Sequence, residues 1–455
     1  MTRSRFAHFV LPLLLAVLVV ALPASAEWKE KVLYSFQGGT TDGSLPAGGV
    51  VFDKAGNLYG ADTSGGSGGC PNQGCGMVFK ISPPAQKGGA WTETSIYAFR
   101  GVINGATDGF TPAGGLIVDE QGNLYGTTAY GGNGPCVLLG TKAGCGIVYE
   151  LSPPTQDSGQ WTYTILYNFQ GGNDGYVPAG NLVLDNKGNL YGATQFGGGS
   201  GTTCNIIYGG QCGTVFRLSP PNHRGGKWTE KVLHAFADGT DGAYPNGGLV
   251  LDSKGAIYGT TFGGGKENSE CGSLGCGTVF ELVPPSREGG VWSEKILYRF
   301  SGQDGANPAA SVVLGVDGDL YGTAYAGANS GYGAVFELAR LDDGTSEHWK
   351  EIVLYRFMDG SDGENPAAGL TLDAQGNLYG ATEYGSAFSG TVFRLRSPKR
   401  TAGSWTFGLL HGFMRSPDGA DPAATLIFDK HGKLYGTTEA GGATCGCGTV
   451  FEIKP

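Results

Sequence analysis

Seven aspartates occur in the same short motif, D-G-x-x-P, and form the largest set of residues in this sequence that could bind a ligand. They are Asp42, Asp108, Asp174, Asp241, Asp304, Asp362 and Asp418. Carboxylates gathered at one surface could hold a cation, calcium above all, or a polar ligand. An aspartate also begins many turns, the next glycine accepts a positive φ, and proline fixes the angle that follows. Because every copy shares the motif, a turn role is favoured, although both interpretations stay open.

Five aromatic residues form a second candidate set, because each stands at the start of a glycine-rich stretch. They are Tyr130, Phe196, Phe262, Tyr325 and Tyr384. Exposed aromatic rings stack on sugar rings, while nearby acid and amide side chains bond the sugar hydroxyls. Rings of this size are also well buried on average, which favours packing between structural units. The sequence therefore predicts either a carbohydrate surface or an aromatic packing contact at these positions.

Signatures of catalytic centres are absent or weak. Residues 65–69 fit G-x-S-x-G, but this run of glycines lacks the strand-to-helix turn that the motif requires. The histidines after residue 26 are scattered, with no H-E-x-x-H pair. We therefore expect no catalytic residue, no metal site and no cofactor, with calcium in the acidic loops as the one exception. A hydrolase or lyase that uses loop carboxylates stays open as an alternative.

The first 26 residues have the features of a Sec-type signal peptide. Arg3 and Arg5 precede an apolar run from Phe9 to Leu22, and residues 24–26 form an A-x-A cleavage site. The run is shorter than the ~20 residues that a membrane-spanning helix needs. The sequence thus predicts an exported chain, extracellular or periplasmic, with no membrane span after cleavage.

Ten cysteines fall into five close pairs, which suits export to an oxidising compartment. The pairs are Cys70/Cys75, Cys136/Cys145, Cys204/Cys212, Cys271/Cys276 and Cys445/Cys447. No pair has the C-x-x-C spacing and no histidine accompanies them, so zinc binding is not favoured. Each pair is expected to form a disulfide within one short loop.

Seven tryptophans mark seven copies of one unit, at intervals of 56 to 70 residues. They are Trp28, Trp91, Trp161, Trp228, Trp292, Trp349 and Trp405. After each tryptophan come an apolar run ending in Phe, the D-G-x-x-P motif and a second apolar run. A G-x-[LI]-Y-G motif, a glycine-rich loop and G-x-V-[FY]-x-[LI] complete the unit.

Each unit contains four strand-like runs of about 5–9 residues, rich in Val, Leu, Tyr and Phe. Seven units of four antiparallel strands predict an all-β, seven-bladed β-propeller over residues 27–455, a single domain after the signal peptide at 1–26. We name the strands A (before the D-x-x-G turn), B (through L-Y-G), C (through V-F) and D (from Trp to Phe). The mature chain begins with a lone D strand and ends with A, B and C, so the first strand is expected to complete the last blade. The glycine of Y-G is expected to let adjacent sheets approach closely near the axis.

The D–A and B–C loops emerge on one face of such a ring. They are long and variable, and they contain the D-G-x-x-P motifs and all ten cysteines, whereas the A–B turns opposite are short and carry a recurrent Asp. Variable loops on a rigid scaffold often carry the binding site. The D–A/B–C face is therefore the predicted binding surface.

The combination [VI]-L-[YH]-x-F, D-G-x-x-P, G-N-L-Y-G-[TA]-T and G-T-V-F-[ER]-L resembles the Gloeo/Verruco (GloVer) tandem-repeat family. The resemblance extends from Trp28 to Ile453. It implies an exported bacterial repeat protein and supplies no catalytic residues. Many relatives carry a C-terminal anchoring tail, which this sequence does not show.

Charge and composition narrow the function further. The formal net charge is −10 with no basic block, which argues against nucleic-acid partners and against docking to anionic membranes. Eighty-four glycines and 15% charged residues are typical of a turn-rich β protein. We expect a secreted, non-enzymatic binding scaffold for a glycan or a protein ligand on the D–A/B–C face. A carbohydrate-active hydrolase or lyase and a structural or adhesive envelope protein are the alternatives.

Overall fold

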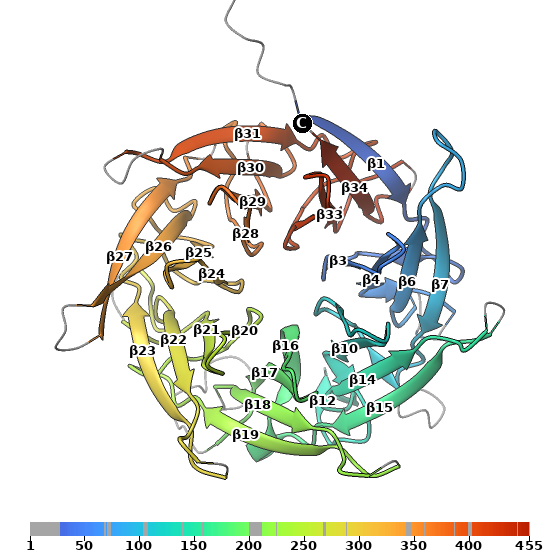
Figure 1. Cartoon of the computed structure of the whole chain (residues 1–455), viewed down its shortest axis with the longest axis horizontal. Coiled ribbons are helices and arrows are strands. Elements are labelled where there is room, and N and C mark those ends of the chain that lie inside the picture. Colours follow the sequence, from blue (N-terminus) through green and yellow to red (C-terminus); the bar gives the residue numbers. More distant parts are fainter. Residues whose placement is uncertain are drawn as a thin grey trace, which may run out of the picture.

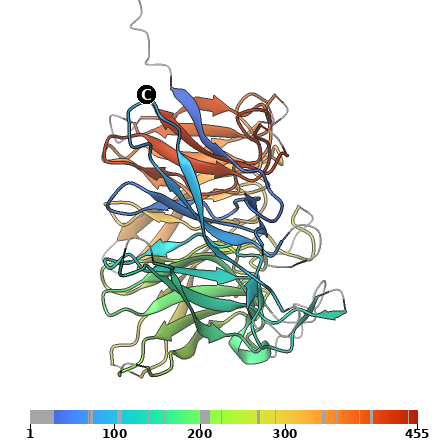
Figure 2. The same cartoon turned by 90° about the vertical axis from the view of Figure 1, so that its right-hand side faces the viewer.

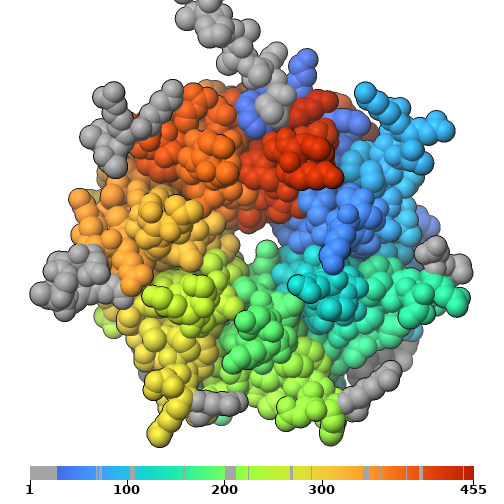
Figure 3. All heavy atoms as spheres, in the orientation of Figure 1, coloured from blue at the N-terminus to red at the C-terminus, as the bar shows by residue number. Residues whose placement is uncertain are grey.

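The computed structural model describes residues 28–454, apart from 68–69, 71–73, 103–107, 139, 157–158, 200–211, 224, 267–269, 288, 343–346, 359, 386, 399–402 and 444. The predicted signal peptide, residues 1–26, and Cys204 lie outside the described residues. Seven four-stranded antiparallel sheets stand in a ring around a central opening, as Figures 1 and 3 show. The predicted seven-bladed β-propeller is confirmed. In the side view of Figure 2, loops protrude from both faces of the ring.

Strands A to D run from the innermost to the outermost position of each blade (Figure 1). Blade 1 contains β3 (Val50–Phe52), β4 (Leu58–Asp62), β6 (Met77–Ser82) and β7 (Thr92–Ala98). Blade 2 contains β9 (Ile117–Val118), β10 (Leu124–Thr128), β14 (Ile147–Ser152) and β15 (Thr162–Asn168). Blade 3 contains β16 (Tyr176–Leu184), β17 (Leu190–Phe196), β18 (Thr214–Ser219) and β19 (Thr229–Ala235). Blade 4 contains β20 (Val250–Leu251), β21 (Ile257–Thr261), β22 (Thr278–Val283) and β23 (Ser293–Arg299).

The remaining blades repeat this order. Blade 5 contains β24 (Val313–Leu314), β25 (Leu320–Ala324), β26 (Ala334–Asp342) and β27 (Glu347–Arg356). Blade 6 contains β28 (Thr371–Leu372), β29 (Leu378–Thr382), β30 (Thr391–Arg396) and β31 (Thr406–Gly412). Blade 7 contains β32 (Ile427–Phe428), β33 (Leu434–Thr438), β34 (Thr449–Lys454) and β1 (Lys29–Ser35).

Short elements decorate the D–A/B–C face. Two-residue ladders extend the A and B strands at the start of blades 1 and 2: β2 (Gly43–Ser44) with β5 (Ser64–Gly65), and β8 (Gly109–Phe110) with β11 (Tyr130–Gly131). The B–C loop of blade 2 contains β12 (Val137–Leu138) and β13 (Thr141–Lys142), and the 3-10 helix η2 (Gly172–Asp174) precedes blade 3. Within the described part of the chain, no helix has the length and apolar character needed to cross a bilayer.

The first strand closes the ring, as the repeat phase predicts. β1 pairs antiparallel with β34, from Lys29 opposite Lys454 to Ser35 opposite Thr449. Blade 7 is thus made from both ends of the described chain. This closure pairs the edge of β34 that would otherwise be open.

The glycine of L-Y-G makes room within its own blade. A Cβ on Gly322 would lie 2.4 Å from the ring of Phe336, its partner across β25 and β26. The same relation holds in every blade, with Tyr149 in place of Phe in blade 2. The expectation that this glycine lets adjacent sheets approach each other is therefore wrong. It admits the aromatic ring of strand C, which is fully buried in the core.

Neighbouring blades are joined where the proline of D-G-x-x-P packs on the glycine before strand C of the preceding blade. A Cβ on Gly333 would lie 2.6 Å from Pro366 Cδ and 2.5 Å from the carbonyl oxygen of Ala324. The same contact occurs at all seven junctions. The pairs are Gly76–Pro112, Gly146–Pro178, Gly213–Pro245, Gly277–Pro308, Gly333–Pro366, Gly390–Pro422 and Gly448–Pro46. We call this contact the blade lock.

A hydrogen bond accompanies each blade lock. The residue before the proline donates its N–H to the carbonyl oxygen that precedes the lock glycine, as Asn365 does to Tyr332 at 2.9 Å. At all seven junctions this donor residue has a positive φ, between 54° and 61°. Such a conformation costs a non-glycine residue about 1–2 kcal/mol. The lock therefore holds seven residues in a conformation that they would not adopt alone.

Five locks are reinforced by cysteines. The second cysteine of each predicted pair directly precedes a lock glycine, and its carbonyl oxygen accepts the lock hydrogen bond. Disulfides Cys70–Cys75, Cys136–Cys145, Cys271–Cys276 and Cys445–Cys447 are present. Cys212 is also disulfide-bonded, and its predicted partner Cys204 lies outside the described residues. Blades 5 and 6 have Tyr332 and Ser389 at this position.

Six of the seven A–B turns are Asx turns formed by the recurrent Asp, and blade 5 has Gly315 at this position. Asp53 Oδ1 accepts the N–H groups of Ala55 and Asn57, and its Oδ2 accepts the side chain of Asn57. Tyr59, the tyrosine of L-Y-G, donates its hydroxyl to the same carboxylate. The hydrogen-bonding groups of this turn are thus paired within the turn and with the neighbouring tyrosine.

Substituting the lock glycine tests the blade lock. Gly333→Ala should lower the free energy of unfolding by about 3 kcal/mol, because the added Cβ meets both strain and overpacking. Gly331→Ala is the matched control: its φ is +87°, but nothing lies within 4 Å of an added Cβ. The control should cost only about 1 kcal/mol. Urea unfolding of both variants measures the difference, and equal losses would show that the contact with Pro366 is unimportant.

Candidate functional site

The seven motif aspartates lie against the outer strands, where each accepts hydrogen bonds. Asp42 accepts the hydroxyl of Tyr34 at 2.9 Å and the N–H of Gln37 at 2.7 Å. Each of the other six likewise accepts a backbone N–H from the loop after strand D. All seven are buried or half-buried. These contacts describe a structural role, and a binding role for the carboxylates stays a prediction.

A glutamate of the following blade faces the motif aspartate at five junctions. These residues lie on the outer strand and are half-buried; four of them are its second residue, and in the longer β27 the glutamate is the fifth. They are Glu30, Glu93, Glu230, Glu294 and Glu351. Burial first, and the charge of the facing aspartate second, raise the pKa of Glu30, Glu93, Glu230 and Glu351 to about 7. Tyr163 and Phe407 take this position at the other two junctions.

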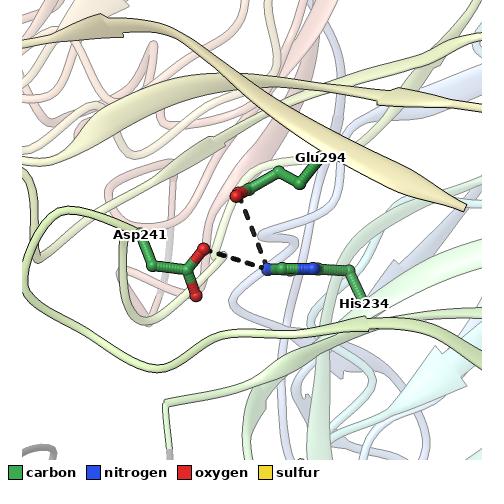
Figure 4. Close-up of side chains that lie close together, drawn as sticks. All are labelled: His234, Asp241 and Glu294. Atoms are coloured by element: carbon green, nitrogen blue, oxygen red, sulfur yellow. Dashed lines mark ion pairs between the residues drawn. The ribbon is translucent and has the colours of Figure 1, made fainter.

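One junction carries a histidine, an aspartate and a glutamate together (Figure 4). His234 is the last residue but one of the outer strand of blade 3, Asp241 follows in the loop, and Glu294 is the second residue of the outer strand of blade 4. His234 Nε2 lies 3.3 Å from Asp241 Oδ1 and 3.6 Å from Glu294 Oε1. Burial, followed by contact with Asp241, raises the pKa of Glu294 well above its usual range. Among the described residues, this is the only group of three or more His, Cys, Asp or Glu side chains whose ligand atoms all lie within 4.8 Å of one another.

The His–Asp–Glu cluster was not predicted. The sequence showed His234 as one of several scattered histidines, and Glu294 was not singled out. The sequence did mark this position as variable: the [YH] residue of the repeat motif is Tyr in five copies and His in two, at 234 and 411. Contact with a glutamate from another repeat could not be seen in a single motif, because it forms only when two blades pack.

The five predicted aromatics occupy two different positions of the repeat. Tyr130, Phe196 and Tyr384 are the residues whose carbonyl oxygens accept the hydroxyl of a strand-B threonine two residues earlier. Phe262 and Tyr325 lie one position earlier and donate their N–H to the residue before the lock proline. Tyr384 is 41% exposed, and the other four are half-buried. All five lie at the D–A/B–C end of strand B.

Aromatic rings gather on blades 2 to 4 of this face. Phe110 stacks on Tyr130 with ring centroids 5.2 Å apart, and Tyr176 stacks on Phe196 at 5.3 Å. Tyr244, the residue before a lock proline, contacts Phe196 edge-on at 5.7 Å. The structure therefore brings two of the predicted aromatics into one aromatic row. The predicted aromatics of blades 5 and 6, Tyr325 and Tyr384, do not belong to it.

Carboxylates gather on blades 6 and 7 of the same face. Burial, followed by the charges of Glu383 and Asp421, raises the pKa of Glu439 to about 7. Contact with Glu383 is the main cause of the raised pKa of Tyr384. The pKa of Tyr325 is raised to about 12, first by burial and then by the charge of Glu383. The D–A/B–C face thus has an aromatic side and an acidic side. We call the second group the acid cluster: Glu383, Asp421 and Glu439.

The opposite face contains a cleft of about 760 Å³ between blades 3 and 4. Trp292 and Tyr191 lie in its wall, and their rings are 6.4 Å apart. The positively charged residues that line it are Lys187, Arg217, Lys231, Lys254 and Arg287. The only acids among the lining residues are Asp185 and Asp252, which belong to A–B turns. This cleft is cationic although the chain has a net charge of −10, and its chemistry suits an anionic ligand.

The closed ring of seven repeated sheets defines a tandem-repeat β-propeller with two chemically distinct loop faces. The family model of the Gloeobacter/Verrucomicrobia repeat matches residues 19–206 and 201–451. The chain therefore belongs to the Gloeobacter/Verrucomicrobia repeat family, and the resemblance seen in its motifs is confirmed. No curated protein matches the sequence.

Solved structures match this chain at low identity and low TM-score. A luciferin-regenerating enzyme is 13% identical with a TM-score of 0.42, and the match covers 75% of this chain and 90% of that one. A gluconolactonase from Xanthomonas campestris is 15% identical with a TM-score of 0.38, over 73% and 82% of the two chains. A protein of unknown function from Dyadobacter fermentans is 10% identical with a TM-score of 0.42, over 94% and 99%. Likeness at this level carries no functional argument.

One further acid, Asp62, is fully buried beside Asp42. Its two carboxylate oxygens have no hydrogen-bond partner. Burial, and then the charges of Asp42 and Glu93, raises its pKa well above the usual range. In five other blades a threonine stands at this position and donates its hydroxyl to a carbonyl oxygen two residues on.

Replacing Asp62 should make the protein more stable at neutral pH. Because the pKa of Asp62 is raised in the folded state, its contribution to stability is full below its unfolded pKa of about 3.9 and is lost as pH rises. Asp62→Thr should therefore raise the free energy of unfolding by about 1–3 kcal/mol at pH 8, and by less at pH 5. Asp62→Asn, which removes only the charge, should flatten the pH dependence in the same way. A gain that is equal at both pH values would contradict the assignment.

Proposed function

We propose that this chain is a non-enzymatic binding protein that holds a glycan on its D–A/B–C loop face. The observation that carries the proposal is the difference between blades on a frame that is otherwise repeated seven times. Blades 2 to 4 present stacked rings such as Phe110–Tyr130 and Tyr176–Phe196, whereas blades 6 and 7 present the acid cluster. The turns and blade locks, which recur in the other blades, do not depend on the side chains of the stacked rings or of the acid cluster.

The two sides of this face match the two kinds of group on a sugar. Aromatic rings pack on the apolar C–H faces of pyranose rings, and carboxylates accept hydrogen bonds from hydroxyls. Tyr384 adds an exposed aromatic ring to the acidic side, where it contacts Glu383. A protein ligand is the alternative occupant of the same face.

We also propose that the protein acts outside the cytoplasm, in the periplasm or the extracellular space. The described disulfides support this, because such bonds persist in oxidising compartments. The predicted signal peptide points the same way. Determining the N-terminus of the exported protein tests it, and a mature chain that begins near residue 27 is the expected result.

A carbohydrate-active hydrolase or lyase is the second candidate function, and one observation favours it. Glu439 has a pKa of about 7 and lies beside Glu383 and Asp421. A carboxylic acid that is partly protonated at neutral pH can act as a general acid in glycoside cleavage. If it does, reducing or unsaturated sugar ends should accumulate, and Glu439→Gln should abolish their release.

Glycan binding by the mature protein tests the main proposal. Tyr384→Ala should weaken binding of the glycan found on an array by at least about tenfold, because an exposed aromatic contact is lost. Lys254→Ala, an exposed substitution in the opposite cleft, is the matched control and should leave affinity unchanged. An acidic glycan for which only Lys254→Ala lowers affinity would place the ligand in the cationic cleft and overturn the choice of face. Binding to no glycan would favour the protein ligand or a structural, adhesive role.

A further inference from the structure

The cluster at the junction of blades 3 and 4 has the spacing of a metal site. Tetrahedral zinc with bonds of about 2.0–2.1 Å holds neighbouring ligand atoms about 3.3 Å apart. His234 Nε2 lies 3.3 Å from Asp241 Oδ1 and 3.6 Å from Glu294 Oε1. Figure 4 shows the three side chains converging from two outer strands and the loop between them.

Two of the three ligand atoms in this cluster make no hydrogen bond. His234 Nε2 and Glu294 Oε1 are buried atoms without a hydrogen bond. The other histidine junction differs, because His411 Nε2 makes a 3.0 Å hydrogen bond with Asp418 Oδ2. The two histidines in equivalent positions therefore differ: His411 is hydrogen-bonded to one aspartate, whereas His234 lies between two carboxylates at ion-pair distance from both.

The other five junctions show that a histidine is not needed for the fold. There a tyrosine stands in place of His234, and its hydroxyl donates a hydrogen bond to the motif aspartate. The oxygen–oxygen distance is 2.8–2.9 Å at four of these junctions, and Tyr298 makes the same bond to Asp304 at the fifth. A tyrosine hydroxyl is a hydrogen-bond donor to a carboxylate, whereas a neutral imidazole nitrogen is a strong ligand for zinc-class metals. Histidine at position 234 thus exchanges a structural hydrogen bond for a ligand atom.

We propose that His234, Asp241 and Glu294 hold one divalent transition-metal ion of the zinc class, which bridges blades 3 and 4. Nε2 of the histidine, Oδ1 of the aspartate and Oε1 of the glutamate are the ligands. Calcium fits less well, because it takes 6–8 oxygen ligands and no imidazole. The three side chains are between 13% and 22% exposed, so a water molecule can occupy the fourth position.

Charge supports the same assignment. Two carboxylates meet at this junction, beside the imidazole and the positive charge of Arg299. Arg299 donates its Nε–H to the carbonyl oxygen of Thr240 at 2.9 Å. A dication at the centre of the cluster would neutralise both acids and join blades through a contact that involves no disulfide.

Zinc binding by the untagged mature protein tests the proposal. After dialysis against micromolar ZnCl2, elemental analysis should find about one zinc per chain, and His234→Tyr should reduce this to near zero. This variant copies the residue found at five other junctions, so it should fold. His411→Tyr is the matched control and should keep the full zinc content, because His411 is already paired with Asp418.

The thermal unfolding midpoint provides a second readout. Zinc should raise the midpoint of the parent protein and of His411→Tyr, but not that of His234→Tyr. Glu294→Gln should weaken zinc binding by at least about tenfold, because a charged ligand becomes a neutral one. A parent protein that retains no zinc, or a His234→Tyr variant that retains as much as the parent, would overturn the proposal.

Discussion

The packing of one proline on one glycine determines how the blades of this protein are joined. At each junction the proline of D-G-x-x-P lies on the glycine before strand C of the preceding blade. The residue before that proline donates its N–H to the same segment and takes a positive φ to do so. The motif aspartate then fixes the start of the loop by accepting a backbone N–H from the end of strand D. One motif thus positions the outer strand, the loop and the next inner strand together, and the cysteine pairs hold the loop that the lock contacts.

A frame repeated this closely leaves a small set of positions free to differ. Strand C rings and locks are similar in every blade and Asx turns in six of the seven, whereas the residue before the lock proline is Tyr244 in one blade and Asp421 in another. The aromatic row and the acid cluster arise at such positions. The same reasoning applies at the outer junctions, where tyrosine is replaced by His234 at one and by His411 at another. Chemical differences between blades, rather than the ring itself, are where a ligand or a metal can be recognised.

Much of the fold could be predicted from the sequence because the same turn and strand motifs recur in all seven repeats. The seven tryptophans predicted the number of blades, the order of the terminal strands predicted closure of the ring, and D-G-x-x-P predicted a turn. The positive φ expected at the motif glycine is present at Gly175, Gly242, Gly305, Gly363 and Gly419. The second positive φ, before the proline, was not expected, because it depends on a hydrogen bond to another blade. For the same reason the sequence placed the Y-G glycine wrongly and missed the pairing of Glu294 with Asp241: both depend on which side chains face each other after packing.

Amide hydrogen exchange at the residue before the lock proline tests the central claim most directly. The N–H of Asn365 is bonded to Tyr332 at 2.9 Å across the junction of blades 5 and 6, where no cysteine reinforces the loop. If the lock joins the blades, this amide should exchange as slowly as those of the neighbouring strands, because it opens only when the junction opens. Exchange as fast as that of exposed loop amides would contradict the account.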